Sequence, residues 1–123
     1  MMILAATNVW CDFFRAGDKT LSSMLEHDFV ATHPLVIGEL AVGCLPKREQ
    51  TIADMRMLTM VKPATFKETH YLLEKNKLYG LGLQWNDLLI LASVITTPDM
   101  LLWTRDGRLA EVAARFQVAY CPQ

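Results

Sequence analysis

Short apolar runs alternate with longer amphipathic segments along this chain. Continuous apolar runs predict buried strands at 2–6, 29–32, 100–104 and 118–121, with a weaker candidate at 60–64. Between them, helical spacing of apolar residues predicts helices over 8–16, 19–27, 34–45, 48–58, 65–79, 85–96 and 107–116. Pro34 suits the first turn of a helix, and Gly80 and Gly82 are expected to end the helix over 65–79.

Alternating strands and helices imply parallel strands joined by helical crossovers. We therefore expect a three-layer α/β/α fold of the α/β class with a mainly parallel central sheet. A chain of 123 residues, 52% of them hydrophobic, fits one domain spanning 1–123. In such folds, functional sites form beyond the carboxyl ends of the strands.

The charge balance and the cysteines exclude several classes of protein. A formal net charge of −1 excludes a strongly basic nucleic-acid coat protein, so any contact with nucleic acid must use local patches. The 3 cysteines show no CxxC spacing, which argues against a disulfide framework or a zinc site, and Cys11 and Cys121 are expected to pack as small apolar groups. No apolar run reaches the ~18 residues of a membrane span, and no leader pattern is present, which predicts a cytoplasmic protein without membrane attachment.

Three acidic residues occupy positions, on apolar helix faces or just after a strand, where removing a carboxylate from water is expected to cost free energy. Glu39 lies inside the apolar segment PLVIGELAVGCL, on the same helical stripe as Leu35 and Val42. Asp87 opens another apolar helix, and Asp106 follows the strand at 100–104 with only Arg105 between. A carboxylate on an apolar face costs several kcal/mol unless it is paired. Together the three acids could offset that cost by holding a divalent cation such as Mg²⁺ or Mn²⁺.

Each acid also has a simpler interpretation. Asp106 could serve only as the N-cap of the helix at 107–116. Glu39 could turn its carboxylate towards solvent, and Asp87 could favour the positive end of its helix. No single acid is specific, so the hypothesis of a metal site depends on all three.

Four segments carry a resemblance to a known family: TNVW after the first strand, HPLVIGELAVG, LQWNDLLILASV and LLWTRDGRL. In their order and spacing, the chain resembles the PIN-domain ribonucleases, most closely the VapC toxins of type II toxin–antitoxin pairs, over essentially its whole length. The resemblance implies an Asp at the end of the first strand, followed by residues that Thr7 and Asn8 match. The expected Asp position is Ala6.

The resemblance assigns roles to further residues. It implies that Glu39, Asp87 and Asp106 hold metal together with position 6, and that Thr104 orients the last acid. Ala6 then has two explanations: a deliberate change that inactivates a toxic enzyme, or a natural loss in a member that only binds. We favour the first, because Asp→Ala is the minimal way to delete a carboxylate and the other acids stand intact.

The activity implied by the resemblance is Mg²⁺- or Mn²⁺-dependent cleavage of RNA phosphodiester bonds, in transfer or ribosomal RNA. The alternative is a catalytically dead module that acts by binding. The implied partners are a VapB-type antitoxin, a second copy of the chain in a homodimer, and operator DNA only through the antitoxin. Apolar positions in 8–16 and 48–58 are candidates for these interfaces, although a core role explains them equally well.

Positive charge near the site segments could guide an RNA backbone. The basic residues closest to those segments are Arg15, Lys47, Arg48, Arg105 and Arg108. Ordinary solvated surface explains each of them as well.

Overall fold

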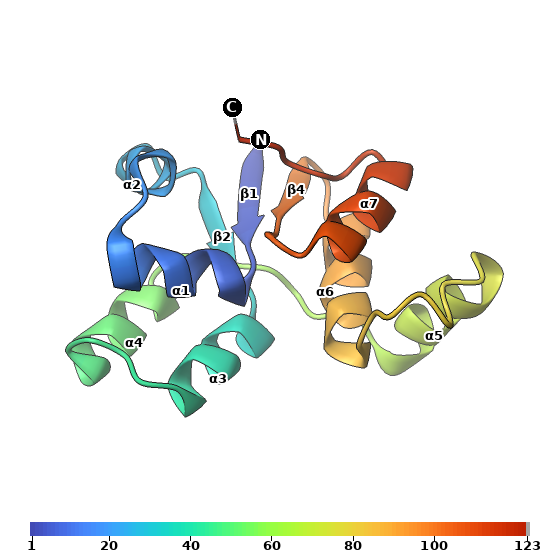
Figure 1. The fold of residues 1–123 in the computed structure, drawn as a ribbon, viewed down its shortest axis with the longest axis horizontal. Coiled ribbons are helices and arrows are strands. Elements are labelled where there is room, and N and C mark those ends of the chain that lie inside the picture. Colours follow the sequence, from blue (N-terminus) through green and yellow to red (C-terminus); the bar gives the residue numbers. More distant parts are fainter. Residues whose placement is uncertain (123) are drawn as a thin grey trace.

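Four short parallel strands form the centre of the computed structural model, which describes residues 1–122 (Figure 1). The strands are β1 (Met2–Ala5), β2 (Val30–Thr32), β3 (Thr59–Met60) and β4 (Met100–Trp103), in the order β3-β2-β1-β4. Ile3 of β1 pairs with Val30 on one side and Leu101 on the other. The prediction of a parallel sheet is confirmed. Of the expected domain at 1–123, Gln123 alone lies outside the described residues.

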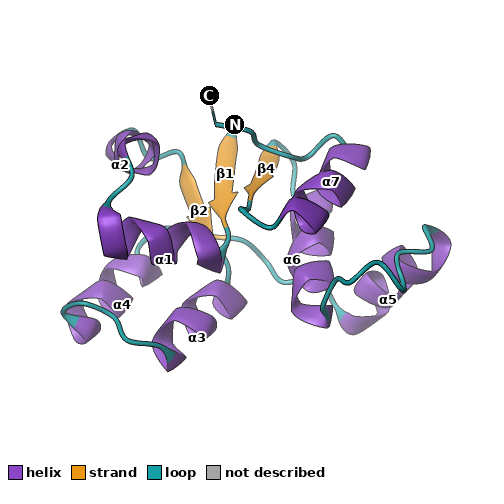
Figure 2. Ribbon diagram, viewed as in Figure 1, coloured by secondary structure: helices purple, strands orange, loops and turns teal. Residues whose placement is uncertain are grey.

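Helices cover both faces of this sheet (Figure 2). One layer holds α1 (Thr7–Ala16), α2 (Lys19–Glu26), α3 (Pro34–Val42) and α4 (Arg48–Arg56). The other holds α5 (Phe66–Lys75), α6 (Trp85–Ile95) and α7 (Gly107–Arg115). Right-handed crossovers explain this division, because the chain moves one way across the sheet from β1 to β3 and then returns to β4. The three-layer α/β/α prediction is confirmed.

The inner strands are apolar because helices cover them on both sides. Leu4 and Ala5 of β1 are fully buried, as is Leu91 of α6. Trp10 and Trp103 also lie in the core. Cys11 and Cys121 are exposed, so the expectation that they pack as small apolar groups is wrong.

Several predicted elements differ from the structure. The weak strand expected at 60–64 is β3 at Thr59–Met60, and the helix expected over 34–45 ends at Val42. Two further differences are larger. The expected strand at 118–121 is reduced to a single parallel bridge between Ala119 and Leu102. The helix expected over 65–79 ends at Lys75, before Gly80 and Gly82. Lys77 there adopts a left-handed φ of 53°, and the N–H of the buried Leu78 donates to the Leu73 carbonyl at 3.0 Å. Burial of Leu78 therefore turns the chain earlier than the glycines would.

The connections leave β1 and β4 in opposite directions. From β1 the chain passes through α1 and α2 to β2, whereas from β4 it passes through α7 to the bridge at Ala119, on the outer side of β4. A crevice opens where connections diverge in this way. Ala6 directly follows β1 and Thr104 directly follows β4, so both lie at this crevice.

The helices are short. The longest helix among residues 1–122 is α6, with 11 residues, and none of the described helices combines the length and apolar character that crossing a membrane requires.

Candidate active site

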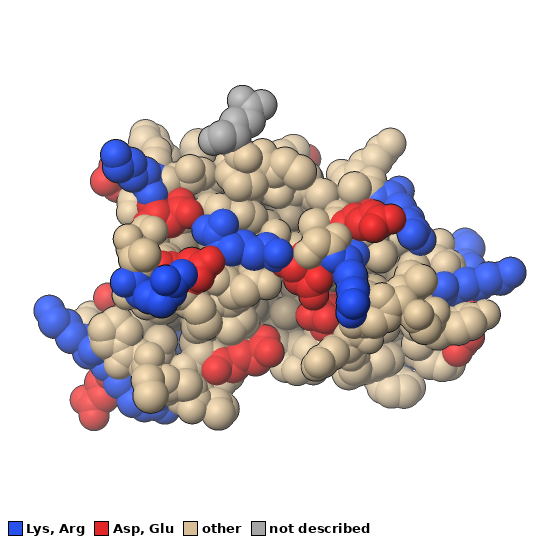
Figure 3. Space-filling view, viewed as in Figure 1, with Lys and Arg blue, Asp and Glu red and all other residues tan. Residues whose placement is uncertain are grey.

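A cavity of about 430 Å³ lies at the carboxyl ends of β1 and β4. It brings together all the acidic and orienting positions predicted from the sequence, namely Ala6, Thr7, Asn8, Glu39, Asp87, Thr104 and Asp106. These residues come from α1, α3, α6 and the loop before α7, with Ala6 between β1 and α1. Figure 3 shows acidic side chains at the middle of this face, with basic side chains on both sides.

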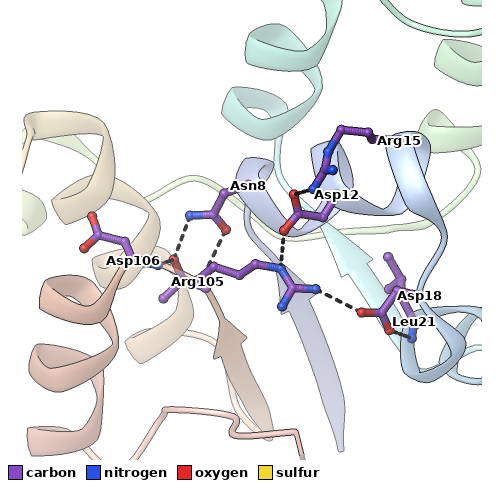
Figure 4. A network of polar contacts seen from close by, with 8 residues as sticks. Asn8, Asp12, Arg15, Asp18, Leu21, Arg105 and Asp106 are labelled. Carbon is purple, nitrogen blue, oxygen red and sulfur yellow. Dashed lines mark hydrogen bonds and ion pairs between the residues drawn. The ribbon is translucent and has the colours of Figure 1, made fainter.

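One group of lining residues, which we call the strand-end wall, consists of Ala6, Asn8, Thr104 and Asp106. Figure 4 shows Asn8 and Asp106 of this group. The Asn8 amide donates to Thr104 Oγ1 at 3.3 Å, and the Asp106 N–H donates to the same oxygen at 3.1 Å. The Arg105 N–H donates to Asn8 Oδ1 at 3.1 Å. These bonds fix the loop after β4 to the first turn of α1.

Asp106 has two roles in this wall. Its Oδ1 accepts the Arg108 N–H at 2.9 Å, which makes it the N-cap of α7, and its side chain also lines the cavity. The capping interpretation and the site hypothesis therefore hold together. Since that bond uses one carboxylate oxygen, the other is available to a ligand.

Two further lining residues, which we call the helix wall, are Glu39 on α3 and Asp87 on α6. Thr7 Oγ1 donates to Glu39 Oε1 at 2.9 Å. Asp87 caps its own helix, because its Oδ2 accepts the Gln84 N–H at 3.0 Å.

Glu39 does not lie on a buried stripe of α3, so the prediction of a costly position is wrong. Its side chain is exposed, and Val42 on the same stripe is 90% exposed. The buried face of α3 contains Val36 and Leu40 instead. Glu39 therefore carries little desolvation cost, and what distinguishes it is its place at the cavity.

A buried histidine joins the two helices of the helix wall. His33 Nδ1 accepts the Leu35 N–H at 3.0 Å and caps α3, while Nε2 lies 3.0 Å from Ser93 Oγ on α6. Because Nδ1 accepts a hydrogen bond, the proton of the neutral ring belongs on Nε2. Burial lowers the pKa of His33, which favours this neutral form.

Asp12 is a cavity residue that the sequence analysis missed. Its carboxylate pairs with Arg105 Nε at 2.7 Å and with Arg15 Nη2 at 3.0 Å, and Asp18 holds Arg105 Nη2 at 2.9 Å. Asp12 lies one helical turn after Asn8, so helical spacing could have placed it on the same face of α1.

The five predicted basic residues are not brought together. Arg105 lines the cavity, but two carboxylates hold it, and Arg15 is paired with Asp12. Lys47, Arg48 and Arg108 are exposed. Phosphate contact by these residues stays a prediction.

The cavity fits a hard divalent cation in its chemistry. Glu39, Asp87 and Asp106 each have a carboxylate oxygen outside the hydrogen bonds described above, and carboxylate oxygens are the donors that Mg²⁺ and Mn²⁺ prefer. As the side chains lie, no three His, Cys, Asp or Glu residues within 1–122 are close enough to hold one ion. Position 6, which is buried at the end of β1, is an alanine and adds no carboxylate to the strand-end wall.

Comparisons with known proteins identify a family and two relatives of this chain. The model of the PIN domain family matches residues 3–115. The chain is 37% identical over 118 residues to proteins called Ribonuclease VapC32 from two strains of Mycobacterium tuberculosis, CDC 1551 / Oshkosh and H37Rv. The matched region covers 96% of this chain and 95% of each relative.

Proposed function

We propose that this chain, which belongs to the VapC ribonucleases of the PIN-domain family, is the toxin of a type II toxin–antitoxin pair. Its active form cleaves RNA phosphodiester bonds with the help of Mg²⁺ or Mn²⁺. The observation that carries this proposal is the convergence of Glu39, Asp87 and Asp106 on one cavity beside Ala6. Those carboxylates are far apart in the sequence, and the cavity lies where ligands bind in parallel α/β folds.

When bound in this cavity, a divalent ion would supply positive charge for a scissile phosphate and would lower the pKa of a bound water. Glu39, Asp87 and Asp106 would hold the ion. Thr104 accepts the Asp106 N–H and so orients the loop that carries this acid, and Thr7 donates to Glu39. Such supporting hydrogen bonds preset the direction of a ligand.

The alanine at position 6 weakens this chain as a nuclease in our proposal. A carboxylate there would line the same cavity as Glu39 and Asp87. Its absence removes one negative charge from the ligand set, so metal affinity and cleavage both fall.

The test is the substitution Ala6→Asp, compared with Ala6→Asn as a neutral control of similar size. Ala6→Asp should raise cleavage of a structured RNA by orders of magnitude in Mn²⁺ or Mg²⁺, more than the ~10–100-fold of a supporting residue. EDTA should abolish the gain, and Ala6→Asn should show none. Calorimetric titration should show tighter Mn²⁺ binding by the Asp variant alone.

Thermal unfolding gives a second measurement, independent of activity. Position 6 is buried, so an Asp there should destabilise the metal-free protein, and Mn²⁺ should restore its Tm. Equal activity of all three proteins in EDTA would place the chemistry elsewhere.

The alternative function is a module that binds without cleaving, which the missing carboxylate favours. If the Ala6→Asp variant and the parent chain bind Mn²⁺ equally and neither cleaves RNA, this alternative is correct.

The proposed partners follow from the family. They are a VapB-type antitoxin, a transfer or ribosomal RNA in the cytoplasm, a second copy of the chain, and operator DNA only through the antitoxin. Of the apolar positions expected at interfaces, Val9, Trp10 and Met55 lie in the core. Met57, which directly follows α4, is 85% exposed and stays a candidate contact.

A further inference from the structure

Arg105, the residue before Asp106, is tied to two other segments of the fold (Figure 4). Its Nε pairs with the Asp12 carboxylate on α1 at 2.7 Å, and its Nη2 donates to Asp18, the N-cap of α2, at 2.9 Å. The backbone N–H of the same arginine donates to Asn8 Oδ1 at 3.1 Å. This residue of the loop after β4 is therefore held through its side chain and through its backbone.

Both carboxylates that hold Arg105 are themselves fixed. Asp12 Oδ1 also accepts a hydrogen bond from Arg15, three residues later on α1, at 3.0 Å. Asp18 Oδ1 accepts the Leu21 N–H at 2.9 Å, while its Oδ2 accepts from Arg105. A guanidinium that is bound by two anchored carboxylates has few orientations open to it, because its donors lie in one plane.

Folding stability alone does not account for this arrangement. The side chains of Arg105 and Asp12 are each 37% exposed, and ion pairs of such exposure contribute little to stability. The strand before the loop is already fixed by packing, since Trp103 is buried in the core, with its ring 5.6 Å from the guanidinium. What the ion pairs add is the position of the loop against α1, at the point where Asp106 begins.

The balance of charge disfavours a contact between Arg105 and an RNA phosphate. Two arginines and two aspartates form the network of Arg15, Asp12, Arg105 and Asp18, so their formal charges cancel. A phosphate is weakly attracted to a neutral network, and it would have to compete with carboxylates that already bind the guanidinium.

We propose that Arg105 is a positioning residue for Asp106. Its guanidinium, held by Asp12 and Asp18, fixes the loop after β4 against α1 and so sets the direction in which the Asp106 carboxylate faces the cavity. Thr104 supports this acid from within the loop, whereas Arg105 connects the loop to α1 and α2. The inference rests on the proposed function, in which Asp106 holds a divalent ion.

Amide hydrogen exchange, followed by NMR, tests the positioning without metal or RNA. In the chain as it stands, Arg105→Gln should speed exchange of the Asp106 and Arg108 amides about fivefold, the upper end of what a surface ion pair supplies. The amide of Leu91, buried on α6, should exchange as before, which separates loosening of the loop from global unfolding. Unchanged exchange at Asp106 and Arg108 would overturn the proposal.

The matched control is Arg115→Gln. Arg115 pairs with Glu111 on α7 at 3.8 Å and lies outside the cavity lining. Loss of this ion pair should leave the exchange of the Asp106 and Arg108 amides unchanged. Equal acceleration in both arginine variants would mean that any lost ion pair loosens the loop, and the proposal would fail.

Metal affinity is the second measurement, made in the Ala6→Asp background. Arg105→Gln should weaken Mn²⁺ binding about fivefold in calorimetric titrations, since it acts on Asp106 only through the loop. Arg105→Lys should recover part of the loss, because an ammonium keeps the charge but lacks the planar fork that meets both carboxylates. Saturating Mn²⁺ should restore RNA cleavage by the Arg105→Gln variant.

A double-mutant cycle then defines the role of Asp12, which is itself a carboxylate in the cavity lining. If Asp12 acts through Arg105, Asp12→Asn should weaken Mn²⁺ binding in the Ala6→Asp background and should have no further effect once Arg105 is replaced by glutamine. Additive losses would mean that Asp12 holds the ion directly, and they would overturn its part in the proposal.

The outcomes distinguish this inference from the proposed nuclease. If the exchange rates and the Mn²⁺ affinity change as expected but no variant cleaves RNA, the nuclease proposal fails and the positioning role stands. If the Ala6→Asp chain cleaves RNA and Arg105→Gln alters neither measurement, only the positioning role fails. Weaker binding of a fluorescein-labelled oligouridine in EDTA, with unchanged Mn²⁺ affinity, would make Arg105 a phosphate contact and would also overturn the inference.

Discussion

The two walls of the cavity are built in different ways. In the strand-end wall, Asn8 and Thr104 are held by hydrogen bonds between polar groups that follow β1 and β4. In the helix wall, Glu39 and Asp87 stand on separate helices, and those helices are joined at a distance through buried His33 and Ser93. The residues of the first wall are hydrogen-bonded to one another, whereas each acid of the second wall accepts a separate hydrogen bond of its own.

This difference has a consequence for metal binding. A ligand on a prearranged loop loses little freedom when an ion binds, whereas an exposed glutamate must be ordered at that moment. We therefore expect the strand-end wall to supply most of the metal affinity. The substitution at position 6 falls on that wall.

Thr104→Val should produce the largest effect among substitutions of supporting residues. The hydroxyl accepts two hydrogen bonds, from Asn8 and from the Asp106 N–H, and valine leaves both donors without it. In the Ala6→Asp background, Mn²⁺ affinity should fall by ~10–100-fold, as is typical when the partner of a ligand is removed. Isothermal titration calorimetry measures the change.

The matched control for this substitution is Thr97→Val. Its hydroxyl donates to the Ser93 carbonyl at 2.7 Å, just after α6 and outside the cavity lining. Equal losses of Mn²⁺ affinity in the two variants would mean that Thr104 acts through stability alone.

The same contrast explains what the sequence could predict. Residues of the strand-end wall follow strands that are buried on both faces, so the apolar run at 100–104 located Asp106. The roles of Ala6 and Thr104 came from the resemblance. The α3 helix is apolar almost throughout, and its sequence does not distinguish the buried Val36 from the exposed Val42. Helical periodicity therefore placed Glu39 on a buried face of α3, although its side chain is exposed. The resemblance had assigned its place in the site.

Contacts between distant residues lay beyond the sequence patterns. Nothing in the local sequence pairs Arg105 with Asp12 and Asp18, because α1, α2 and the loop before α7 meet only in the folded chain. The last strand was overpredicted for a related reason. A strand at the edge of a sheet pairs with one neighbouring strand only. Here the pairing of the last segment with β4 stops after the single bridge between Ala119 and Leu102.

Acidification should weaken the helix wall through His33. The pKa of this residue is lowered in the folded state, so the unfolded chain binds more protons near its ordinary value of 6.5. The contribution of neutral His33 to the free energy of unfolding is therefore fully present above pH 6.5. It falls as the pH drops below that value, by at most ~1.4 kcal/mol per pH unit for one proton. Urea unfolding at pH 7.5 and 5.5 should show the loss.

His33→Asn separates this proton from the others. Asparagine can still accept the Leu35 N–H as an N-cap but does not titrate, so its stability should change less between the two pH values. His27→Gln, at an exposed histidine, should keep the pH dependence of the parent chain. A parental pH dependence in His33→Asn would assign the effect to other groups.

Thr7→Val should have the smallest effect, because it releases Glu39 from its one described hydrogen bond without moving α3. The bond is exposed, and a hydrogen bond in water contributes at the low end of the usual range, about 0.5 kcal/mol, or roughly twofold in affinity. Glu39 also has a long side chain that can reach an ion without Thr7. In the Ala6→Asp background, Mn²⁺ affinity should thus fall about twofold, well short of the Thr104→Val loss measured by the same titration. If the two losses are equal, Glu39 is as firmly prearranged as Asp106, and the two walls contribute alike to the site.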